Sequence, residues 1–292
     1  MQDYLTKVMA FNGQFRIYVA NTTQLVTRAQ QIHNTKPLAA VALGRTLTGT
    51  ALLSAALLKT SGLLTIKIQG NGPLSPIIVD GNAQGQVKGY LHHPEYDWPQ
   101  NDLQSISLQQ AVGKNGNLAV IKDLGLKTPF TGQVPLVSGE IGQDLTYYLA
   151  KSEQMPAAVG VSVTLKQNFD IKSAGGFLVQ VLPGAQPKMV EKVEKRIENL
   201  PAIGDLLAED GSLENLILQI VKKDQFEILT KMPLNYSCNC TKEKFAKALA
   251  SLPEKDLATI LNEDHQAETV CRFCGKKYFF SELELEKLLK LK

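Results

Sequence analysis

The chain has four cysteines, and their clustering constrains the fold more than any other feature of the sequence. They form a C-x-C pair, Cys238 and Cys240, and a C-x-x-C pair, Cys271 and Cys274, separated by thirty residues, and none occurs before position 238. Four thiolates satisfy the tetrahedral coordination of a closed structural Zn²⁺ site and leave no open position for a catalytic water. The sequence therefore predicts one Zn²⁺ per chain, bound by these four cysteines.

Three other uses of four cysteines compete with zinc. Structural disulfides need an oxidising compartment, and the first residues show no basic stretch followed by an apolar run, the pattern of a secretion signal. The spacings match neither the bacterial nor the plant-type ferredoxin pattern of iron–sulfur proteins. A thioredoxin-like motif needs its C-x-x-C pair on a β-α-β unit, which does not surround Cys271. His265 could replace one sulfur, but it lies among polar residues and we expect it at the surface.

The sequence near the cysteines predicts a small domain folded around the metal. Gly275 directly follows the second C-x-x-C ligand and permits a tight turn, after which residues 278–280 can form the return strand of a hairpin. Helices are expected over residues 242–252 and 254–262, and Ser281 and Glu284 form a capping box before a third helix. So short a segment can hardly bury enough apolar surface to fold unaided. Structural zinc contributes on the order of 10–16 kcal/mol in small peptides, so we expect this domain to unfold without metal.

The C-x-C pair is unusual, because ordinary structural zinc sites use C-x₂₋₄-C pairs. Metal binding keeps sulfur as the thiolate, which is the form that attacks oxidants. A purely structural zinc ribbon needs no such cramped spacing. The arrangement therefore favours a redox switch over a ribbon that is only structural.

The preceding sequence predicts a mixed α/β core domain over residues 1–183. Strand-like alternation marks residues 11–19, and a helix is expected over residues 37–59. Further strands are expected over residues 63–69, 77–80, 86–91, 118–123, 132–137, 159–165 and 177–182, in β-meander sheets. Gly175 and Gly176, between the last two strands, supply conformational freedom. Residues 38–58 are long and apolar enough to span a membrane. Arg45 lies inside this stretch, where a charge would be costly, so we interpret it as a buried helix and expect no membrane association.

The character of the chain changes at residue 184. Apolar residues recur at helical spacing between charged ones, and Ser212 is placed to cap one such helix, so residues 184–234 are interpreted as an amphipathic helical linker. Its apolar stripes must be covered, most simply by the core domain. The sequence thus predicts an α+β chain with a core domain at 1–183, a helical linker at 184–234 and a zinc-binding domain at 235–292.

Composition argues against nucleic acid and catalysis. Ten Lys and Arg against nine Asp and Glu follow Cys238, a net of +1, which is no phosphate-binding footprint. A zinc-ribbon nucleic-acid-binding protein is kept as the alternative. His92 and His93 before Pro94 are interpreted as a solvated turn, and the sequence has no G-x-S-x-G, P-loop or H-E-x-x-H motif, so we expect no enzyme.

The whole sequence resembles the heat-shock protein 33 family, the redox-regulated holdase chaperones of bacteria. The most specific marks are Cys238-Asn-Cys240 and Cys271-Arg-Phe-Cys274. Supporting stretches are residues 64–70 (LTIKIQG) with Gly72-Pro73, residues 85–90, residues 152–156 (SEQMP) and residues 175–180 (GGFLVQ) with Leu182-Pro183.

The resemblance implies a cytoplasmic protein that is inactive as a reduced, zinc-bound monomer. Oxidation under unfolding conditions would form Cys238–Cys240 and Cys271–Cys274 disulfides and release the zinc. The C-terminal domain and linker would then unfold and expose apolar surface, and the protein would form a homodimer. The resemblance further implies that it holds unfolding client proteins without ATP and passes them to ATP-dependent refolding chaperones.

Overall fold

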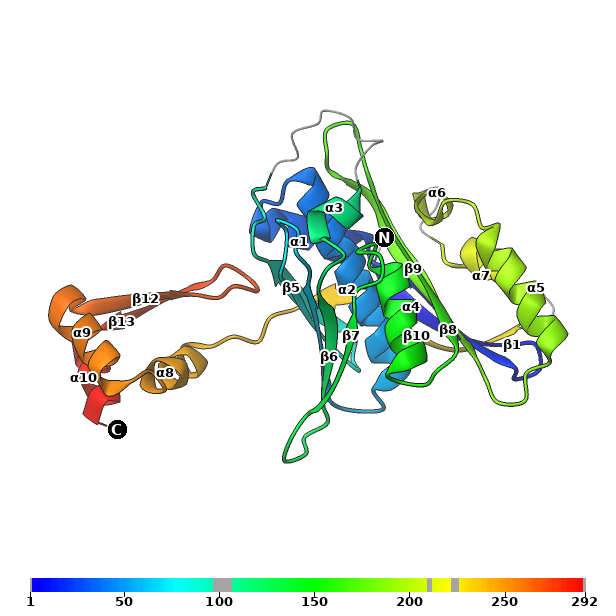
Figure 1. Cartoon of the computed structure of the whole chain (residues 1–292). Coiled ribbons are helices and arrows are strands. Elements are labelled where there is room, and N and C mark those ends of the chain that lie inside the picture. The colour runs from blue at the N-terminus through cyan, green and yellow to red at the C-terminus, as the bar shows by residue number, and fades with distance from the viewer. Residues whose placement is uncertain (1, 97–106, 209–211, 222–225, 291–292) are drawn as a thin grey trace. The chain divides into compact units, whose positions relative to one another are not determined.

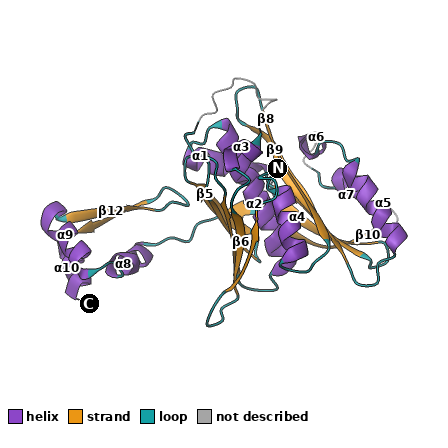
Figure 2. Ribbon diagram, in the orientation of Figure 1, coloured by secondary structure: helices purple, strands orange, loops and turns teal. Residues whose placement is uncertain are grey.

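The computed structural model describes residues 2–96, 107–208, 212–221 and 226–290 (Figure 1). The chain forms two compact units, Met1–Ser237 and Cys238–Lys292. The fold is α+β, as the sequence predicts. Both units combine strands with helices, as Figure 2 shows.

Two sheets make up the first unit. One has the strand order β10-β1-β2-β9-β8 and the other β11-β5-β4-β3-β6-β7. The strands of the first sheet are β1 (Tyr4–Ala10), β2 (Phe15–Asn21), β8 (Ala157–Leu165), β9 (Ile171–Val181) and β10 (Phe226–Pro233). Those of the second are β3 (Leu63–Gln69), β4 (Ile77–Asn82), β5 (Gln86–Leu91), β6 (Asn117–Asp123), β7 (Phe130–Pro135) and β11 (Asn235–Tyr236). Sequential strands pair antiparallel in β3-β4-β5 and in β6-β7, which confirms the predicted meanders.

Helix α2 (Pro37–Leu57) is the centre of the first unit. It contacts β4 and β5 of one sheet and β8 and β9 of the other. Of its 18-residue apolar stretch, 89% is buried. Small residues allow this: side chains from Val26 and Val163 lie directly against Gly44. Arg45 reaches the edge of the core, where its guanidinium donates to Glu140 Oε2 at 2.9 Å. The helix has the length and composition of a membrane span, but it packs as the core helix that the sequence predicts.

Three further helices of the first unit lie around α2 and the sheets. They are α1 (Thr23–His33), α3 (Leu108–Val112) and α4 (Gly142–Lys151). Helix α4 buries Leu145, Tyr148 and Leu149.

Two strand predictions were wrong in position. Residues 11–14 form a turn between β1 and β2, with left-handed backbone at Phe11, Asn12 and Gly13, so the predicted strand begins too early. The strand predicted over residues 177–182 begins earlier, because Gly175 and Gly176 lie inside β9 and not between two strands. A Cβ on Gly175 would collide with the carbonyl oxygen of Ala20 in β2. These glycines therefore allow neighbouring strands to approach closely. Glycine is favoured at such contacts as it is in flexible connections.

A helical layer covers one face of the five-stranded sheet, opposite α1 and α2 (Figure 1). It consists of α5 (Pro187–Glu198), α6 (Ile203–Ala208) and α7 (Glu214–Ile220). Its apolar stripes form a second core with the sheet, built from Val193, Leu207, Leu213, Leu216, Ile217 and Ile220 on the helices and Val8, Ile17, Val19, Phe177 and Val179 on the strands. The stripes are covered by the core domain, as the periodicity predicts.

The linker region is not helical throughout. Residues Phe226–Pro233 form β10, which pairs antiparallel with β1, so the predicted helical stretch 184–234 ends in a strand. Five successive β10 residues are exposed, and the strand has no apolar alternation by which the sequence could reveal it. Ser212 does serve the start of α7, since its hydroxyl accepts the N–H of Glu214 at 3.1 Å, although Leu213 holds the cap position.

The second unit contains α8 (Lys242–Ala250), α9 (Glu254–Asp264), β12 (Gln266–Val270), β13 (Lys277–Ser281) and α10 (Glu282–Lys290). Its buried core is small and consists, within residues 238–290, of Leu249, Leu257, Tyr278, Phe280 and Leu285. Half of the predicted capping box is present, because Glu284 Oε2 accepts from the N–H of Ser281 at 2.9 Å. So small a core supports the expectation that this unit needs a metal to fold.

Asp3 ties the chain's first strand to α1, and it predicts a pH dependence. Its carboxylate accepts the N–H groups of Gln24 at 3.0 Å and Leu25 at 2.6 Å. Burial raises the pKa of Asp3 from 3.8 to about 6, against the lowering effect of these two hydrogen bonds. A carboxyl whose pKa is higher in the folded state stabilises the fold fully below about pH 4, and this contribution is lost as the pH rises through 6.

We therefore expect the α1 N-terminus to lose about 2–3 kcal/mol of protection between pH 4 and pH 7. Asp3→Asn should remove most of this slope, because the amide does not titrate. Hydrogen exchange of the first turn of α1, corrected for the intrinsic pH dependence of exchange, measures it. An unchanged slope in the variant would show that another group titrates.

Candidate metal centre

The C-x-x-C pair lies on the turn of the β12–β13 hairpin. The N–H of Cys271 donates to the carbonyl oxygen of Lys276 at 2.9 Å, and the N–H of Gly275 donates to that of Cys271 at 2.8 Å. Gly275 has a left-handed backbone with a φ of 72°. The turn predicted from the glycine after the second cysteine is therefore confirmed, and it directs both sulfurs to one side.

The C-x-C pair immediately precedes α8. Thr241 caps this helix by accepting the N–H of Lys244 at 3.3 Å. The Lys244 ammonium in turn donates to the carbonyl oxygen of Asn239 at 2.8 Å. The residue between the two cysteines is therefore anchored to the first turn of the helix.

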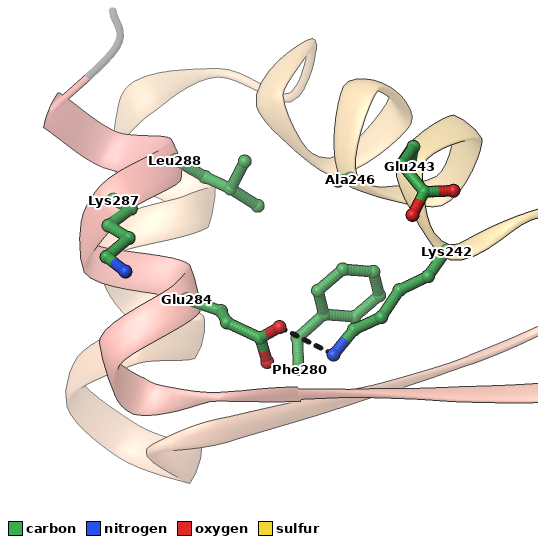
Figure 3. A pocket seen from close by; sticks show the side chains of 7 residues that line it. All are labelled: Lys242, Glu243, Ala246, Phe280, Glu284, Lys287 and Leu288. Atoms are coloured by element: carbon green, nitrogen blue, oxygen red, sulfur yellow. Dashed lines mark hydrogen bonds and ion pairs between the residues drawn. The ribbon is translucent and has the colours of Figure 1, made fainter.

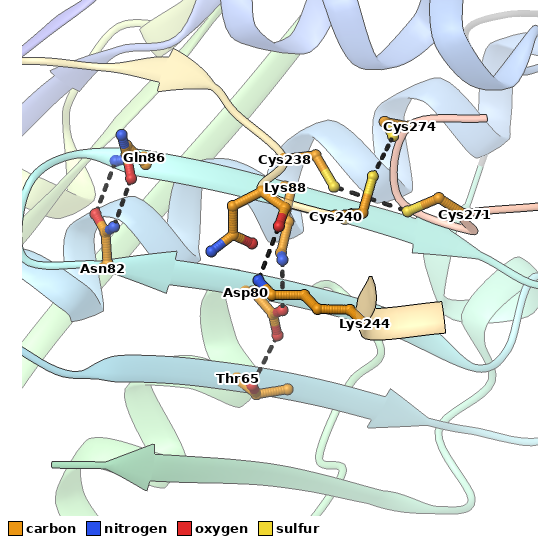
Figure 4. A network of polar contacts seen from close by, with 12 residues as sticks. Thr65, Asp80, Asn82, Gln86, Lys88, Cys238, Cys240, Lys244, Cys271 and Cys274 are labelled. Carbon is orange, nitrogen blue, oxygen red and sulfur yellow. Dashed lines mark hydrogen bonds and ion pairs between the residues drawn. The ribbon is translucent and has the colours of Figure 1, made fainter. Parts of the chain in front are cut away.

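All four sulfurs meet at one point, although the two pairs are far apart in sequence. The Sγ atoms of the four cysteines lie within 4.8 Å of one another. Cys238 Sγ is 3.7 Å from Cys271 Sγ, and Cys240 Sγ is 3.4 Å from Cys274 Sγ (Figure 4). Four ligands on a tetrahedron with Zn–S bonds of about 2.3 Å would be separated by about 3.8 Å. The site therefore fits a tetrahedral metal ion, and the four residues are those predicted from the sequence.

The sulfur contacts of 3.7 and 3.4 Å each join one motif to the other. All four cysteines are free thiols. A disulfide requires an S–S separation of about 2.05 Å, far shorter than any of these contacts. The geometry is that of four ligands around a common centre.

The surroundings of Cys238, Cys240 and Cys274 shift the pKa values of these thiols in different directions. Burial raises the pKa of Cys238 and, as the largest cause, raises the pKa of Cys274 to about 12. Burial also acts to raise the pKa of Cys240, but hydrogen bonds from Tyr278 and the other cysteines outweigh it and lower that pKa to about 7. Neighbouring thiolates repel one another, so all four ionise together only if a cation lies between them.

The other candidate ligands considered from the sequence lie outside this centre. His265 is exposed at the end of α9 and its Nδ1 is 2.8 Å from Glu282 Oε1. His93 pairs with Glu95 at 3.2 Å, with both side chains exposed. These are the solvated positions expected for both histidines.

The sequence did not reveal the role of Tyr278. We expected it only as a residue of the return strand, and it also donates to Cys240 Sγ at 3.2 Å. The available signal was its position four residues after Cys274 in a strand whose alternate side chains face inward. Contact with the other cysteine pair could not be read from that spacing.

In the same unit, α8, β13 and α10 line an open pocket of about 240 Å³ (Figure 3). Lys242 crosses it, with its ammonium 2.5 Å from Glu284 Oε1 and 5.1 Å from the centre of the Phe280 ring. The hydrogen bond from Lys242 and that from the N–H of Ser281 lower the pKa of Glu284 to about 2. This pair joins α8 to α10, so it links the helix after the C-x-C pair to the end of the unit.

Known proteins are similar to this chain in sequence and fold over nearly its whole length. A family model described as "Hsp33 protein" matches residues 3–281. The chain is 50% identical over 289 residues to a "33 kDa chaperonin" of Latilactobacillus sakei, with 99% of each chain covered. It is 44% identical over 287 residues to a "33 kDa chaperonin" of Staphylococcus aureus, with 98% of each chain covered. A crystal structure of a 33 kDa chaperonin (heat shock protein 33 homolog) from Thermotoga maritima is similar with a TM-score of 0.89 and 37% identity, covering 100% of this chain and 99% of that one.

Proposed function

The chain belongs to the Hsp33 family, and we propose that it is a redox-regulated chaperone that holds unfolding proteins without ATP. In the reduced state Cys238, Cys240, Cys271 and Cys274 bind one Zn²⁺ and the protein is inactive. Bound Zn²⁺ supplies the positive charge that keeps all four sulfurs as thiolates and holds the tail folded. Four sulfurs within 4.8 Å of one another, in a unit with a small core, are the observation that carries this proposal.

Oxidation is the proposed signal. One thiolate attacks an oxygen of hydrogen peroxide and becomes a sulfenic acid, and a second thiolate then displaces its oxygen to close a disulfide. Each disulfide releases two electrons, which with two protons reduce one peroxide to two waters. We propose that the pairs are Cys238–Cys240 and Cys271–Cys274, which requires the sulfurs to leave their arrangement around a common centre.

The loss of the four thiolates removes the ligands, so the metal leaves and the tail unfolds. We propose that the helical layer then detaches from the five-stranded sheet and exposes the second core. Apolar surface of this kind binds unfolded chains, and it also supports a homodimer of the oxidised protein. In this scheme residues 1–183 are the stable core, 184–234 the linker and 235–292 the switch.

The proposed partners follow from this scheme. They are unfolding client proteins, which the oxidised form hands to ATP-dependent refolding chaperones. Thiols that must stay reduced at rest suit a reducing compartment, so we propose a cytoplasmic location. Holding a client requires no chemical step on it, and we assign no catalytic residue, nucleic acid or membrane to this function.

Peroxide combined with mild heat tests the proposal. We expect release of about one equivalent of zinc, measured with a chromophoric chelator, and the two proposed disulfides in peptide mass spectra. The treated protein should suppress aggregation of a heat-unfolded client, and reductant should reverse this. If the oxidised protein never protects a client, the proposal of a redox switch is wrong. Retention of the reduced protein on DNA at low salt would instead favour the zinc-ribbon nucleic-acid-binding alternative.

A further inference from the structure

Tyr278 holds Cys240 through two atoms. Its hydroxyl lies 2.9 Å from the carbonyl oxygen of Cys240 and 3.2 Å from the Sγ of the same residue. A phenol has a single O–H to donate, so the two acceptors share it. The contact joins the hairpin that carries the C-x-x-C pair to the segment that carries the C-x-C pair.

The ring of Tyr278 is buried and packs against neighbouring side chains. The side chain is only 8% exposed. Phe245 of α8 packs against it with ring centres 5.0 Å apart, and the Lys276 ammonium lies 5.2 Å from the ring centre. Across the hairpin, Tyr278 pairs with Thr269. Its hydroxyl is therefore held at Cys240 by packing, and the hydrogen bond does not have to order a free side chain.

The Tyr278 hydroxyl, which donates to Cys240 Sγ, differs in kind from the donors to the other sulfurs. The sulfurs of Cys238 and Cys274 interact with the backbone N–H groups of Cys240 and Lys276. Any residue supplies a backbone N–H, whereas the donor to Cys240 Sγ is the hydroxyl of one side chain. Tyr278 is the single tyrosine in residues 238–292, so a substitution can remove this one donor and leave the others in place.

We propose that Tyr278 is a positioning residue of the metal centre and sets how readily Cys240 is oxidised. This inference rests on the proposed zinc-bound redox switch. A hydrogen bond to a thiolate draws electron density from sulfur, which makes it a poorer nucleophile towards peroxide. Anchoring the Cys240 carbonyl keeps the same sulfur in ligand position. Tyr278 thus strengthens metal binding and slows oxidation at one cysteine of the four.

Tyr278→Phe tests this in the full-length chain, because it keeps the ring and removes the hydroxyl. We expect the Zn²⁺ dissociation constant, measured by chelator competition, to rise about 10-fold, within the range for lost outer contacts of metal ligands. With Co²⁺ in place of Zn²⁺, the sulfur-to-metal charge-transfer band should shift. Timed alkylation and mass spectrometry should show faster loss of Cys240 under peroxide than in the wild type.

Thr269→Val is the matched control. It removes a hydroxyl from the same hairpin, one that donates to the carbonyl oxygen of Tyr278 at 3.4 Å and not to a sulfur. We expect it to bind Zn²⁺ and to oxidise like the wild type. If both variants change equally, the effect is general destabilisation and the inference fails.

If Tyr278→Phe binds no metal at all, 3-fluorotyrosine decides the question. Its more acidic hydroxyl is a stronger donor, so it should slow oxidation of Cys240; faster or equal oxidation overturns the inference. Wild type that binds no metal contradicts the proposed function. Wild type that behaves as proposed, with Tyr278→Phe indistinguishable from it, contradicts only the role of Tyr278.

Discussion

Replacing Cys271 by serine is expected to unfold residues 238–292 and to leave the core of the first unit around α2 folded. Cys271 is the most buried of the four ligands, at 4% exposed. Serine removes the thiolate and leaves three ligands. Structural zinc contributes on the order of 10–16 kcal/mol in small peptides, more than the whole stability of many domains. The five buried core side chains of residues 238–290 cannot replace that contribution.

Hydrogen exchange with mass spectrometry measures this prediction. Peptides from α8 to α10 should exchange within the dead time in the variant and in chelator-treated wild type. Peptides from α2 and β3 should stay protected, since they belong to the other unit.

His265→Asn is the control for the ligand set. His265 has left-handed backbone with a φ of 54°, which asparagine tolerates. Because its ring contacts Glu282 and not the sulfurs, we expect this variant to keep its metal and its protection. Loss of metal in His265→Asn, or a protected tail in Cys271→Ser, would contradict four-cysteine ligation.

Ile217→Ala is expected to make the reduced protein protect clients without oxidant. Ile217 is 1% exposed and belongs to the core between α7 and the five-stranded sheet. Truncation of such a side chain costs about 2–5 kcal/mol. Because 1.4 kcal/mol is a factor of ten, a loss of about 3 kcal/mol would raise the fraction of molecules with a detached layer about a hundredfold.

Leu218→Ala is the matched control, since it removes a similar side chain from the next position of the same helix. Leu218 is 38% exposed and faces away from the sheet core, so we expect little change. Aggregation of a heat-unfolded client with each reduced variant measures the effect. The zinc content must stay at about one per chain in both variants. The contradicting outcome is that hydrogen exchange shows Ile217→Ala to destabilise α7 while the variant never protects a client. In that case, release of the helical layer is not what exposes the client-binding surface.

Several elements could be predicted from local sequence. The spans of β3 and β5 match the predicted residues 63–69 and 86–91, because each strand is bounded by glycine or turn residues and alternates regularly. The core helix α2 and the Glu284 half of the capping box at Ser281 were confirmed for the same reason, since both depend on residues within a few positions of one another. The placement of Gly175 between two strands was wrong, because glycine suits a flexible connection and a close strand contact equally well.

By itself the sequence determined which four cysteines form the candidate metal centre, the α+β class and the apolar stripes of α5 and α7. Residue type and spacing decide these, and both are local. Only the tertiary structure decided that residues 226–233 form β10 beside β1, that α2 packs between two sheets, and that Tyr278 reaches Cys240. These contacts join residues far apart in the chain, and their free energy depends on which surfaces fold against each other. No short-range pattern in the sequence predicts these long-range contacts.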